Sequence, residues 1–326
     1  MTDLPFPYES IFEIKSESDF NEMACQLFQH QIKKNKTYRD FVNQLKINFA
    51  KINDYHQIPF LPISFFKSHN IISENLKAES TFYSSGTTGL ELSKHLVSDL
   101  SLYDLSLLKG FENNFGKITD YSIFALLPSY HENKNSSLLY MVSKLIEESK
   151  NKGGFYLNNT SELLRDINEV KKNKKVILIG VSYALLDLAE EHKPDLSNII
   201  VIETGGMKGR RKEMTKFDLH DSLKKSFQSK VIFSEYGMTE LLSQAWSNGD
   251  GIFSTPPWMK ILTRDYTDPF TFVENQTGGI NVIDLANVHS CAFISTQDLG
   301  IIRGNQFEIV GRFDNADLRG CNLLVS

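Results

Sequence analysis

Three short apolar runs decide the fold: KVILIG at residues 175–180, NIIVIETGG at 198–206 and KVIFSEYG at 230–237. Each run is rich in Val and Ile, as buried strands are, and segments with helical spacing at 184–191 and 212–228 separate them. Strands that alternate with helices predict parallel βαβ units and an α/β fold. Ligands of such sheets bind outside the carboxyl ends of the strands, so the glycine turns that end the second and third runs are candidate binding positions.

The flanking segments extend this pattern. Helical spacing predicts three upstream helices, at about 18–50 (with Ser18 as a possible cap), 98–115 and 136–149. The apolar run at 122–127 reads as a buried strand, and the two prolines in 58–68 predict an extended or looped stretch. From about residue 251 the pattern changes to short strands and turns, which predicts a smaller β-rich region that completes the same domain.

Length and composition limit the class of protein. The 326 residues suggest about two domains or one large α/β domain, and a net charge of −5 gives no general footprint for nucleic acid. We find no signal peptide, and no run approaches the ~20 apolar residues of a membrane span. The three cysteines, Cys25, Cys291 and Cys321, are scattered, which argues against a disulfide framework or a structural zinc site and fits a reducing cytoplasm.

A glycine- and hydroxyl-rich loop, YSSGTTG at 83–89, is the strongest candidate for a phosphate site. Glycine lets the backbone approach a ligand closely, and backbone N–H groups and hydroxyls donate to phosphate oxygens. The candidate residues are Ser84, Ser85, Gly86, Thr87, Thr88 and Gly89. The loop lacks the pattern of a Walker loop or of a dinucleotide fold, and taken alone it could be a solvated turn.

Two later segments carry charge close to strand ends. Gly205-Gly206 precedes a basic cluster that includes Lys208 and Arg210, which is either a solvated charge run or a set of cations that neutralises a polyphosphate. In EYGMTE at 235–240, an aromatic ring can stack on a base, a threonine hydroxyl can bond a phosphate, and a glutamate can hold Mg²⁺. The alternative for this second segment is a surface turn.

Two more segments follow near the end of the chain. STQDLG at 295–300 reads as a strand end with a carboxylate and a turn glycine, where Asp298 could accept hydrogen bonds from two ribose hydroxyls. GRFDNADLRG occupies 311–320.

In this order, YSSGTTG, YGMTE, STQDLG and GRFD resemble the motifs of the adenylate-forming superfamily of acyl-CoA synthetases and luciferase-like ligases. The resemblance runs from about residue 58 to 321. The stretch TGGINVIDL followed by STQDLG is most similar to the phenylacetate-CoA ligase branch. FLPISFFKS, LLPSYHENKNSSLLYMV and TGGMKGRRKEM are closer still to the long-chain fatty acid–protein ligases, or acyl-protein synthetases, of bacterial bioluminescence.

The resemblance implies ATP and Mg²⁺ as cofactors. It places the hydroxyl-rich loop on the ATP phosphates, and a histidine at position 131 in the acyl pocket, although a plain loop histidine fits that position as well. The other positions it carries over are Tyr236, Asp298 and Arg312 for the nucleotide, Thr239 for the α-phosphate, Glu240 for Mg²⁺, and Asp314 as a hinge. Gly205, Gly206 and Gly237 are further nucleotide candidates because they follow strand ends.

Two departures from the superfamily pattern matter. The usual lysine beyond the glycine-rich loop is not obvious, with Lys94 only a candidate, and the sequence ends at Ser326, so we expect the small C-terminal domain with its catalytic lysine to be absent. Adenylation would then rely on the basic cluster, Lys208 and Arg210 among it, or on a partner. The expected organisation is a catalytic domain over 1–310, with a helical lead at about 1–57, and a hinge motif and tail over 311–326.

Acyl-protein synthetases also end early and carry a cysteine near the C-terminus that accepts the acyl group, which points to Cys321. Arg319 nearby should favour its thiolate, whereas the alternative is a small apolar residue in a short strand. We therefore expect an acid–thiol ligase that activates a carboxylic acid, a fatty acid by resemblance, as acyl-AMP and passes it through Cys321 to an acyl-CoA reductase or carrier protein. The alternatives are an acyl- or aryl-CoA or acyl-carrier ligase whose small domain acts in trans, and a non-catalytic nucleotide- or acyl-binding subunit.

Overall fold

The computed structural model describes residues 4–85, 92–128, 133–206, 211 and 214–313. Its helices are α1 (Glu17–Lys34), α2 (Lys36–Gln44), α3 (Phe65–Ser68), α4 (Leu100–Phe115), α5 (Ser137–Ser149), α6 (Thr160–Val170), α7 (Ser182–His192) and α8 (Lys216–Phe227). Its strands are β1 (Leu61–Pro62), β2 (Ser80–Tyr83), β3 (Lys94–Val97), β4 (Tyr121–Leu126), β5 (Gly154–Phe155), β6 (Lys175–Val181), β7 (Ile200–Thr204), β8 (Phe233–Tyr236), β9 (Ala245–Ser247), β10 (Ile252–Ser254), β11 (Met259–Arg264), β12 (Gly278–Asp284), β13 (Phe293–Arg303) and β14 (Gln306–Arg312).

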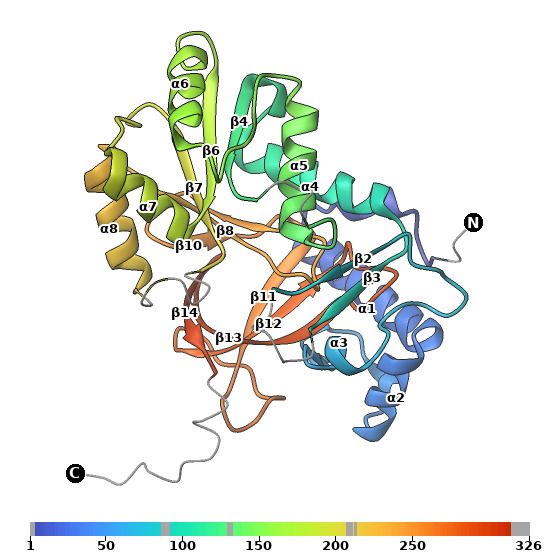
Figure 1. Cartoon of the computed structure of the whole chain (residues 1–326). Helices are drawn as coiled ribbons and strands as arrows, with labels where there is room; N and C mark the ends of the chain where they lie inside the picture. The colour runs from blue at the N-terminus through green and yellow to red at the C-terminus, as the bar shows by residue number, and fades with distance from the viewer. Residues whose placement is uncertain (1–3, 86–91, 129–132, 207–210, 212–213, 314–326) are drawn as a thin grey trace, which may run out of the picture.

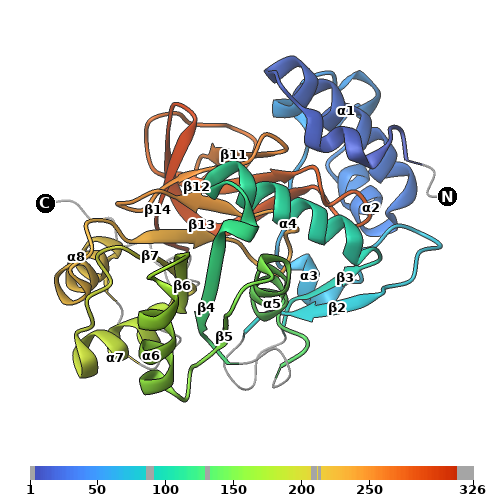
Figure 2. The ribbon, with the colours of Figure 1, turned by 90° about the horizontal axis from the view of Figure 1, so that it is seen from above.

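One mixed sheet runs through the described part of the chain, in the order β11-β12-β13-β14-β10-β9-β8-β7-β6-β4-β5 (Figure 1). The strands β5, β4, β6, β7 and β8 pair in parallel, as the alternation of strands and helices predicts. Helices α4 and α5 lie against one face of this parallel part and α6 and α7 against the other (Figure 2). The α/β fold expected from the sequence is confirmed.

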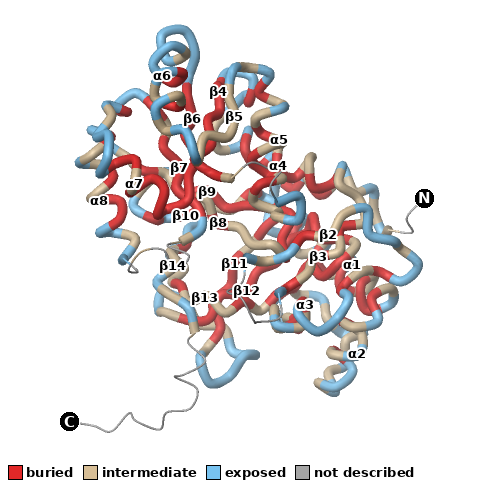
Figure 3. Tube along the Cα trace, viewed as in Figure 1, coloured by how far each residue is buried: buried red, intermediate tan, exposed pale blue. Residues whose placement is uncertain are grey.

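The second half of the sheet is the expected β-rich region. Strands β11 to β14 pair in antiparallel order, and β1 adds in parallel to β13. Buried side chains follow the strands of both halves and the inner faces of the helices (Figure 3). Among the helices of the described residues, none combines the length and the apolar character that crossing a membrane requires.

The N-terminal helices are part of this β-rich core. Gln31 on α1 is fully buried; its amide donates to the carbonyl of Asn287 over 2.8 Å and accepts from the backbone N–H of Ala292 over 3.0 Å. Asn35 donates to the carbonyl of Ser290 over 3.0 Å. Two buried amides therefore hold the helical lead on the turn between β12 and β13.

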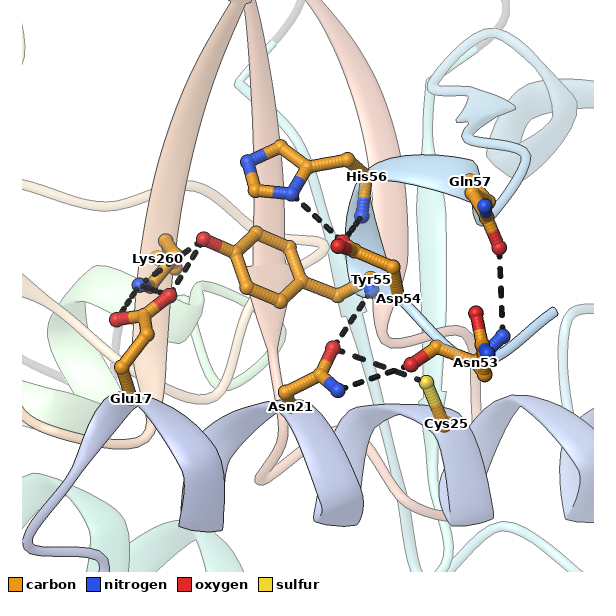
Figure 4. A network of polar contacts seen from close by, with 9 residues as sticks. All are labelled: Glu17, Asn21, Cys25, Asn53, Asp54, Tyr55, His56, Gln57 and Lys260. Carbon is orange, nitrogen blue, oxygen red and sulfur yellow. Dashed lines mark hydrogen bonds and ion pairs between the residues drawn. The ribbon is translucent and has the colours of Figure 1, made fainter.

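A second, more exposed contact joins the lead to β11 (Figure 4). The ammonium of Lys260 lies between the Glu17 carboxylate and the Tyr55 hydroxyl, and the ring of Tyr55 also lies 4.8 Å from the ammonium. The Tyr55 hydroxyl donates to Glu17 over 2.5 Å, so the three groups satisfy one another.

The single helix expected at about 18–50 is wrong. The helix breaks at Asn35, whose side chain accepts from the N–H of Tyr38 and so starts α2. The break follows from the tertiary contact of Asn35 with Ser290, which local spacing does not reveal. The N-cap of α1 is Ser16 rather than Ser18, because Ser16 and Asp19 form a reciprocal capping box.

Two further expectations need correction. The stretch 58–68, expected to be extended or looped, is extended at the strand β1 but ends in the one-turn helix α3. STQDLG does not end a strand: Asp298 and Gly300 lie inside the eleven-residue β13, opposite β14. Gly300 is needed there because a Cβ would come within 2.5 Å of the Glu308 carbonyl oxygen, and a register shift between Leu299 and Gly300 accommodates the close approach.

Candidate active site

Side chains from three of the sequence motifs, on β8, β13 and β14, meet at Asp298. The hydroxyl of Tyr236 donates to Oδ2 of Asp298 over 2.9 Å, and Nε of Arg312 lies 3.2 Å from Oδ1 of the same carboxylate. Burial raises the pKa of Asp298, while the Arg312 guanidinium and the Tyr236 hydroxyl oppose that rise. The side chain of Arg312 is 69% exposed and that of Asp298 only 13%, so the cation lies at the rim and the carboxylate beneath it.

The ring of Tyr236 is fixed by its aromatic neighbours. Its centroid lies 5.4 Å from that of Phe307 and 5.9 Å from that of Phe253, and these two rings stack on each other. Burial raises the pKa of Tyr236 far above the usual value, so the hydroxyl stays protonated and donates to Asp298. The packing and the hydrogen bond therefore hold the Tyr236 ring, which we expect at adenine, in one orientation.

The hydroxyl-rich loop starts and ends on the hairpin of β2 and β3. Tyr83 and Lys94 are paired residues of this hairpin, so the candidate lysine lies at its loop end. The N–H of Ser84 donates to the Ser93 carbonyl over 3.0 Å, and the N–H of Ser93 donates back to Oγ of Ser84 over 3.0 Å. Ser85 follows and is exposed. The expected phosphate contacts of Gly86, Thr87, Thr88 and Gly89 lie outside the described residues.

The YGMTE segment contacts strand β3 of this hairpin. A ring nitrogen of His95, on β3, donates to the Thr239 carbonyl over 2.8 Å; burial lowers the pKa of His95 to about 4, so the ring is neutral. The amide of Asn287 donates to the Glu240 carbonyl over 2.7 Å. Backbone positions of Thr239 and Glu240 are therefore set from two sides.

The carboxyl group of Glu240 is the candidate metal ligand. Glu240 is only 4% exposed. Burial raises the pKa of its carboxyl group, and a hydrogen bond with Ser93 opposes that rise. Within the described ranges, no group of three or more His, Cys, Asp and Glu side chains forms a metal site. Mg²⁺ nevertheless fits, because it is commonly held by one or two carboxylates together with the phosphates of its nucleotide.

The structure shows whether a side chain would fit at the three candidate glycines. Gly205 has φ of +65°, which a side chain would strain, and a Cβ on Gly206 would meet nothing within 4 Å. At Gly237 a Cβ would come within 2.3 Å of a carboxylate oxygen of Glu235. A side chain would therefore be strained at Gly205 and would collide with Glu235 at Gly237, whereas Gly206 has open space beside it.

The basic cluster after Gly206 is only partly described. Lys208 and Arg210 lie outside the described residues, whereas the guanidinium of Arg211 binds Asp187 over 2.9 Å and Glu190 over 2.7 Å, both on α7. Arg211 is therefore paired with carboxylates of a neighbouring helix and is not free to bind phosphate in this arrangement.

Two other predicted site residues, at positions 131 and 321, also lie outside the described residues, as does the expected hinge at 314. The N–H of Tyr83 donates to the carbonyl of Asn135 over 2.8 Å, so the segment that follows position 131 lies against the hydroxyl-loop hairpin.

One hollow in the described structure lies away from these motifs. It has a volume of about 780 Å³ and lies between the helical lead and the β11 strand, with Tyr55, Lys260 and Phe307 in its walls. Its described lining contains none of the predicted site residues.

Comparison with known proteins gives this geometry a family. The family model described as "Acyl-protein synthetase, LuxE" matches residues 6–326. The chain belongs to the LuxE acyl-protein synthetase family. As a member it is a ligase that activates an acid as an acyl-adenylate and transfers the acyl group to a thiol.

Two curated relatives resemble this acyl-protein synthetase over most of their length. The long-chain-fatty-acid–luciferin-component ligase of Vibrio harveyi is 23% identical over 327 residues, covering 92% of this chain and 85% of the relative. The ligase of the same name from Aliivibrio fischeri is 24% identical over 351 residues, covering 97% and 90%.

Solved structures with the same fold are adenylate-forming enzymes. A 2-hydroxyisobutyryl-CoA ligase in complex with 2-HIB-AMP and CoA has a TM-score of 0.68 at 11% identity, covering 97% of this chain and 76% of the other. ATP-bound MatB from Rhodopseudomonas palustris has a TM-score of 0.54 at 17% identity over 71% of this chain, which spans 47% of the MatB chain. At these identities the likeness shows the fold.

Sequence reasoning missed the residues that hold the YGMTE segment in this acyl-protein synthetase. Asp284 is fully buried at the end of β12, where it accepts from the backbone N–H groups of Leu242 and Ser243 over 2.8 and 2.9 Å and from the Ser243 hydroxyl over 2.6 Å. Burial raises the pKa of this carboxyl, and the hydrogen bonds oppose that rise. The signal available was a single carboxylate inside the apolar run GGINVIDL.

Proposed function

We propose that this ligase activates a long-chain fatty acid with ATP and passes the acyl group, through Cys321, to a partner protein. The observation that carries the proposal is the hydrogen bond between Tyr236 and Asp298, because it brings the expected adenine and ribose positions to one place. The names of the two curated relatives supply the class of acid.

The first step is an attack by the fatty acid carboxylate on the α-phosphorus of ATP. A carboxylate O–P bond forms, the bond from the α-phosphorus to the bridging oxygen breaks, and pyrophosphate leaves. Two anions must approach each other, so the site must supply positive charge and fixed donors. Mg²⁺, when bound, supplies Lewis-acid neutralisation of the phosphates next to Glu240.

The residues of this chain then have separate tasks in that step. Tyr236 and Asp298 orient the nucleoside, Arg312 lies at the rim beside them, and Thr239 donates to the α-phosphate. The phosphates are held by the loop positions Ser84, Ser85, Gly86, Thr87, Thr88 and Gly89, and Lys208 and Arg210 add positive charge. Gly205, Gly206 and Gly237 leave room for the ligand, and His131 lies beside the acyl chain. Most of the rate enhancement would come from positioning.

In the second step the thiolate of Cys321 attacks the acyl carbon, the bond from that carbon to the AMP oxygen breaks, and AMP leaves. The length of the chain permits this. The N–H of Phe313 donates to the Gln297 carbonyl over 2.8 Å, next to Asp298, so the tail of residues 314–326 starts at the site. Eight residues from Phe313 to Cys321 can span at most about 27 Å. An acyl-CoA reductase or a carrier protein in the reducing cytoplasm would accept the acyl group.

Intact-mass spectrometry after incubation with ATP, Mg²⁺ and a panel of acids tests the proposal. We expect an acyl adduct with a fatty acid and ATP, and its loss in Cys321→Ser while acid-dependent pyrophosphate release persists. A soluble thioester formed with CoA and no protein adduct would instead support a CoA ligase. Absence of acid-dependent pyrophosphate release would leave only a binding subunit.

A further inference from the structure

A buried carboxylate lies directly behind the Gly205-Gly206 turn. Glu203, at the end of β7, has no exposed surface and accepts from the hydroxyls of Ser182 over 3.1 Å and Ser234 over 2.7 Å. Its other partners come from α8: the ammonium of Lys216 and a ring nitrogen of His220, 3.5 Å away. Side chains from α7, α8 and β8 therefore converge on one carboxylate.

The ion pair with Lys216 keeps this carboxylate charged. Burial alone would raise the pKa of Glu203, but Lys216, His220 and Ser234 outweigh burial and bring it to about 2. A buried charge that loses its partner is strongly destabilising, so Glu203 requires Lys216 to stay where it is. The ion pair thus links the end of β7 to the start of α8.

This ion pair connects the two ends of the segment that carries the expected phosphate-binding glycines. Residues 205–215 leave β7 right after Glu203 and Thr204 and return at Lys216, so both ends of the segment are attached to the same ion pair. The Thr204 hydroxyl also donates to Glu235 over 2.5 Å, which joins the ends of β7 and β8.

Lys216 also reaches the aromatic group around Tyr236. Its ammonium lies 5.9 Å from the ring centroid of Phe253, and the centroids of Phe253 and Tyr236 are 5.9 Å apart. One side chain outside every sequence motif therefore contacts the supports of both the glycine turn and the ring expected at adenine.

We infer that Lys216 is a positioning residue for the adenine nucleotide, acting through Glu203 on the Gly205-Gly206 turn and through Phe253 on Tyr236. The inference rests on the proposed function, since it assigns the bound molecule as ATP. Lys216 does not touch the reacting atoms in this assignment; it determines how well the free site matches the nucleotide.

The test compares Lys216→Met with Lys225→Met, using acid-dependent pyrophosphate release by the full chain. Lys225 lies on the same helix in an exposed i,i+4 pair with Asp221, so it controls for loss of one positive charge on α8. For Lys216→Met we expect KM for ATP to rise about tenfold, with KM for the fatty acid and kcat changed less than about twofold. Lys225→Met should match the wild type, and Lys216→Arg should recover most of the affinity. A merely structural role would lower kcat through loss of folded enzyme and leave KM for ATP unchanged.

Because Lys216→Met leaves a buried carboxylate without its cation, a second variant keeps the test sharp. Glu203→Gln with Lys216→Met removes both charges and preserves shape, so it should fold, and it should still raise KM for ATP. If the wild type releases pyrophosphate and both Lys216 variants keep the wild-type KM for ATP, the positioning role is overturned while the proposed function survives. If the wild type shows no acid-dependent release, the proposed function fails, and this inference fails with it.

Discussion

The phenol of Tyr236 and the carboxylate of Asp298 form a hydrogen bond of 2.9 Å across 62 residues of sequence. The bond links the end of a parallel strand in one half of the sheet to the middle of an antiparallel strand in the other. This hydrogen bond therefore joins the two halves of the sheet at the place where the nucleotide is proposed to bind.

Asp298→Asn should weaken ATP recognition. The amide keeps the shape but offers one acceptor oxygen in place of two and loses the charge that pairs with Arg312, so KM for ATP is expected to rise about tenfold. Steady-state pyrophosphate release at varied ATP measures this. The exposed Asp268→Asn, in a turn with Thr271, is the matched control. An unchanged KM for ATP in Asp298→Asn would remove the ribose assignment.

Glu240→Gln should cut acid-dependent pyrophosphate release by about 100-fold while the protein stays folded. The neutral amide fits the buried site, which burial already makes unfavourable for charge, but it is a poor ligand for Mg²⁺. The melting temperature reports the fold, and release at saturating Mg²⁺ reports activity. The exposed Glu274→Gln should leave both unchanged. Full activity in Glu240→Gln would show that the metal is held elsewhere.

Glu235 should make stability depend on pH near neutrality. Burial is the main cause that raises its pKa, to about 7 from an unperturbed 4.5, with the nearby Glu203 adding to the rise. Between these two values the native protein holds a proton that the unfolded chain has released, so stability falls as pH rises from 4.5 to 7 and is level above. Glu235→Gln should remove about 1–3 kcal/mol of that fall. Chemical denaturation at pH 5 and pH 8 measures the difference, and parallel curves for variant and wild type would contradict the assignment.

Asp284→Asn should destabilise the protein by about 2–4 kcal/mol. Its two oxygens accept from Leu242, Ser243 and Ala286, and an amide would turn donors toward donors at one of these positions. Urea denaturation measures the loss, with the exposed Asp221→Asn as a control expected within about 0.5 kcal/mol of the wild type. A wild-type midpoint for Asp284→Asn would mean that the loop after Glu240 does not depend on this carboxylate.

The parallel core could be predicted because its signal is local. Residues 176–180 and 199–202 are apolar throughout, and strands buried on both faces need no alternation. The break at Asn35 could not be predicted, since it depends on a carbonyl 255 residues away. The same holds for the place of Asp298 inside β13, which requires the pairing with Arg312 that only the folded sheet provides.

At the site, residues with a distinctive chemistry could be predicted from the sequence. The buried residues that hold them in place could not. Tyr236 and Asp298 stand out as an aromatic and a carboxylate beside glycines, and they do meet. Glu203 and Asp284 look like single acids in apolar strands, and their importance comes from how many donors the fold directs at each.

The hydrogen bonds of Gln31 and Asn35 to the turn after β12 make the first helices a support of the proposed metal ligand. The same turn supplies Asn287, which holds the backbone of Glu240, so only one layer of side chains separates α1 from the proposed metal ligand. Trimming the N-terminal segment would therefore disable the enzyme rather than shorten it. Natural variation at these helical amides should be matched by compensating changes between Asn287 and Ala292.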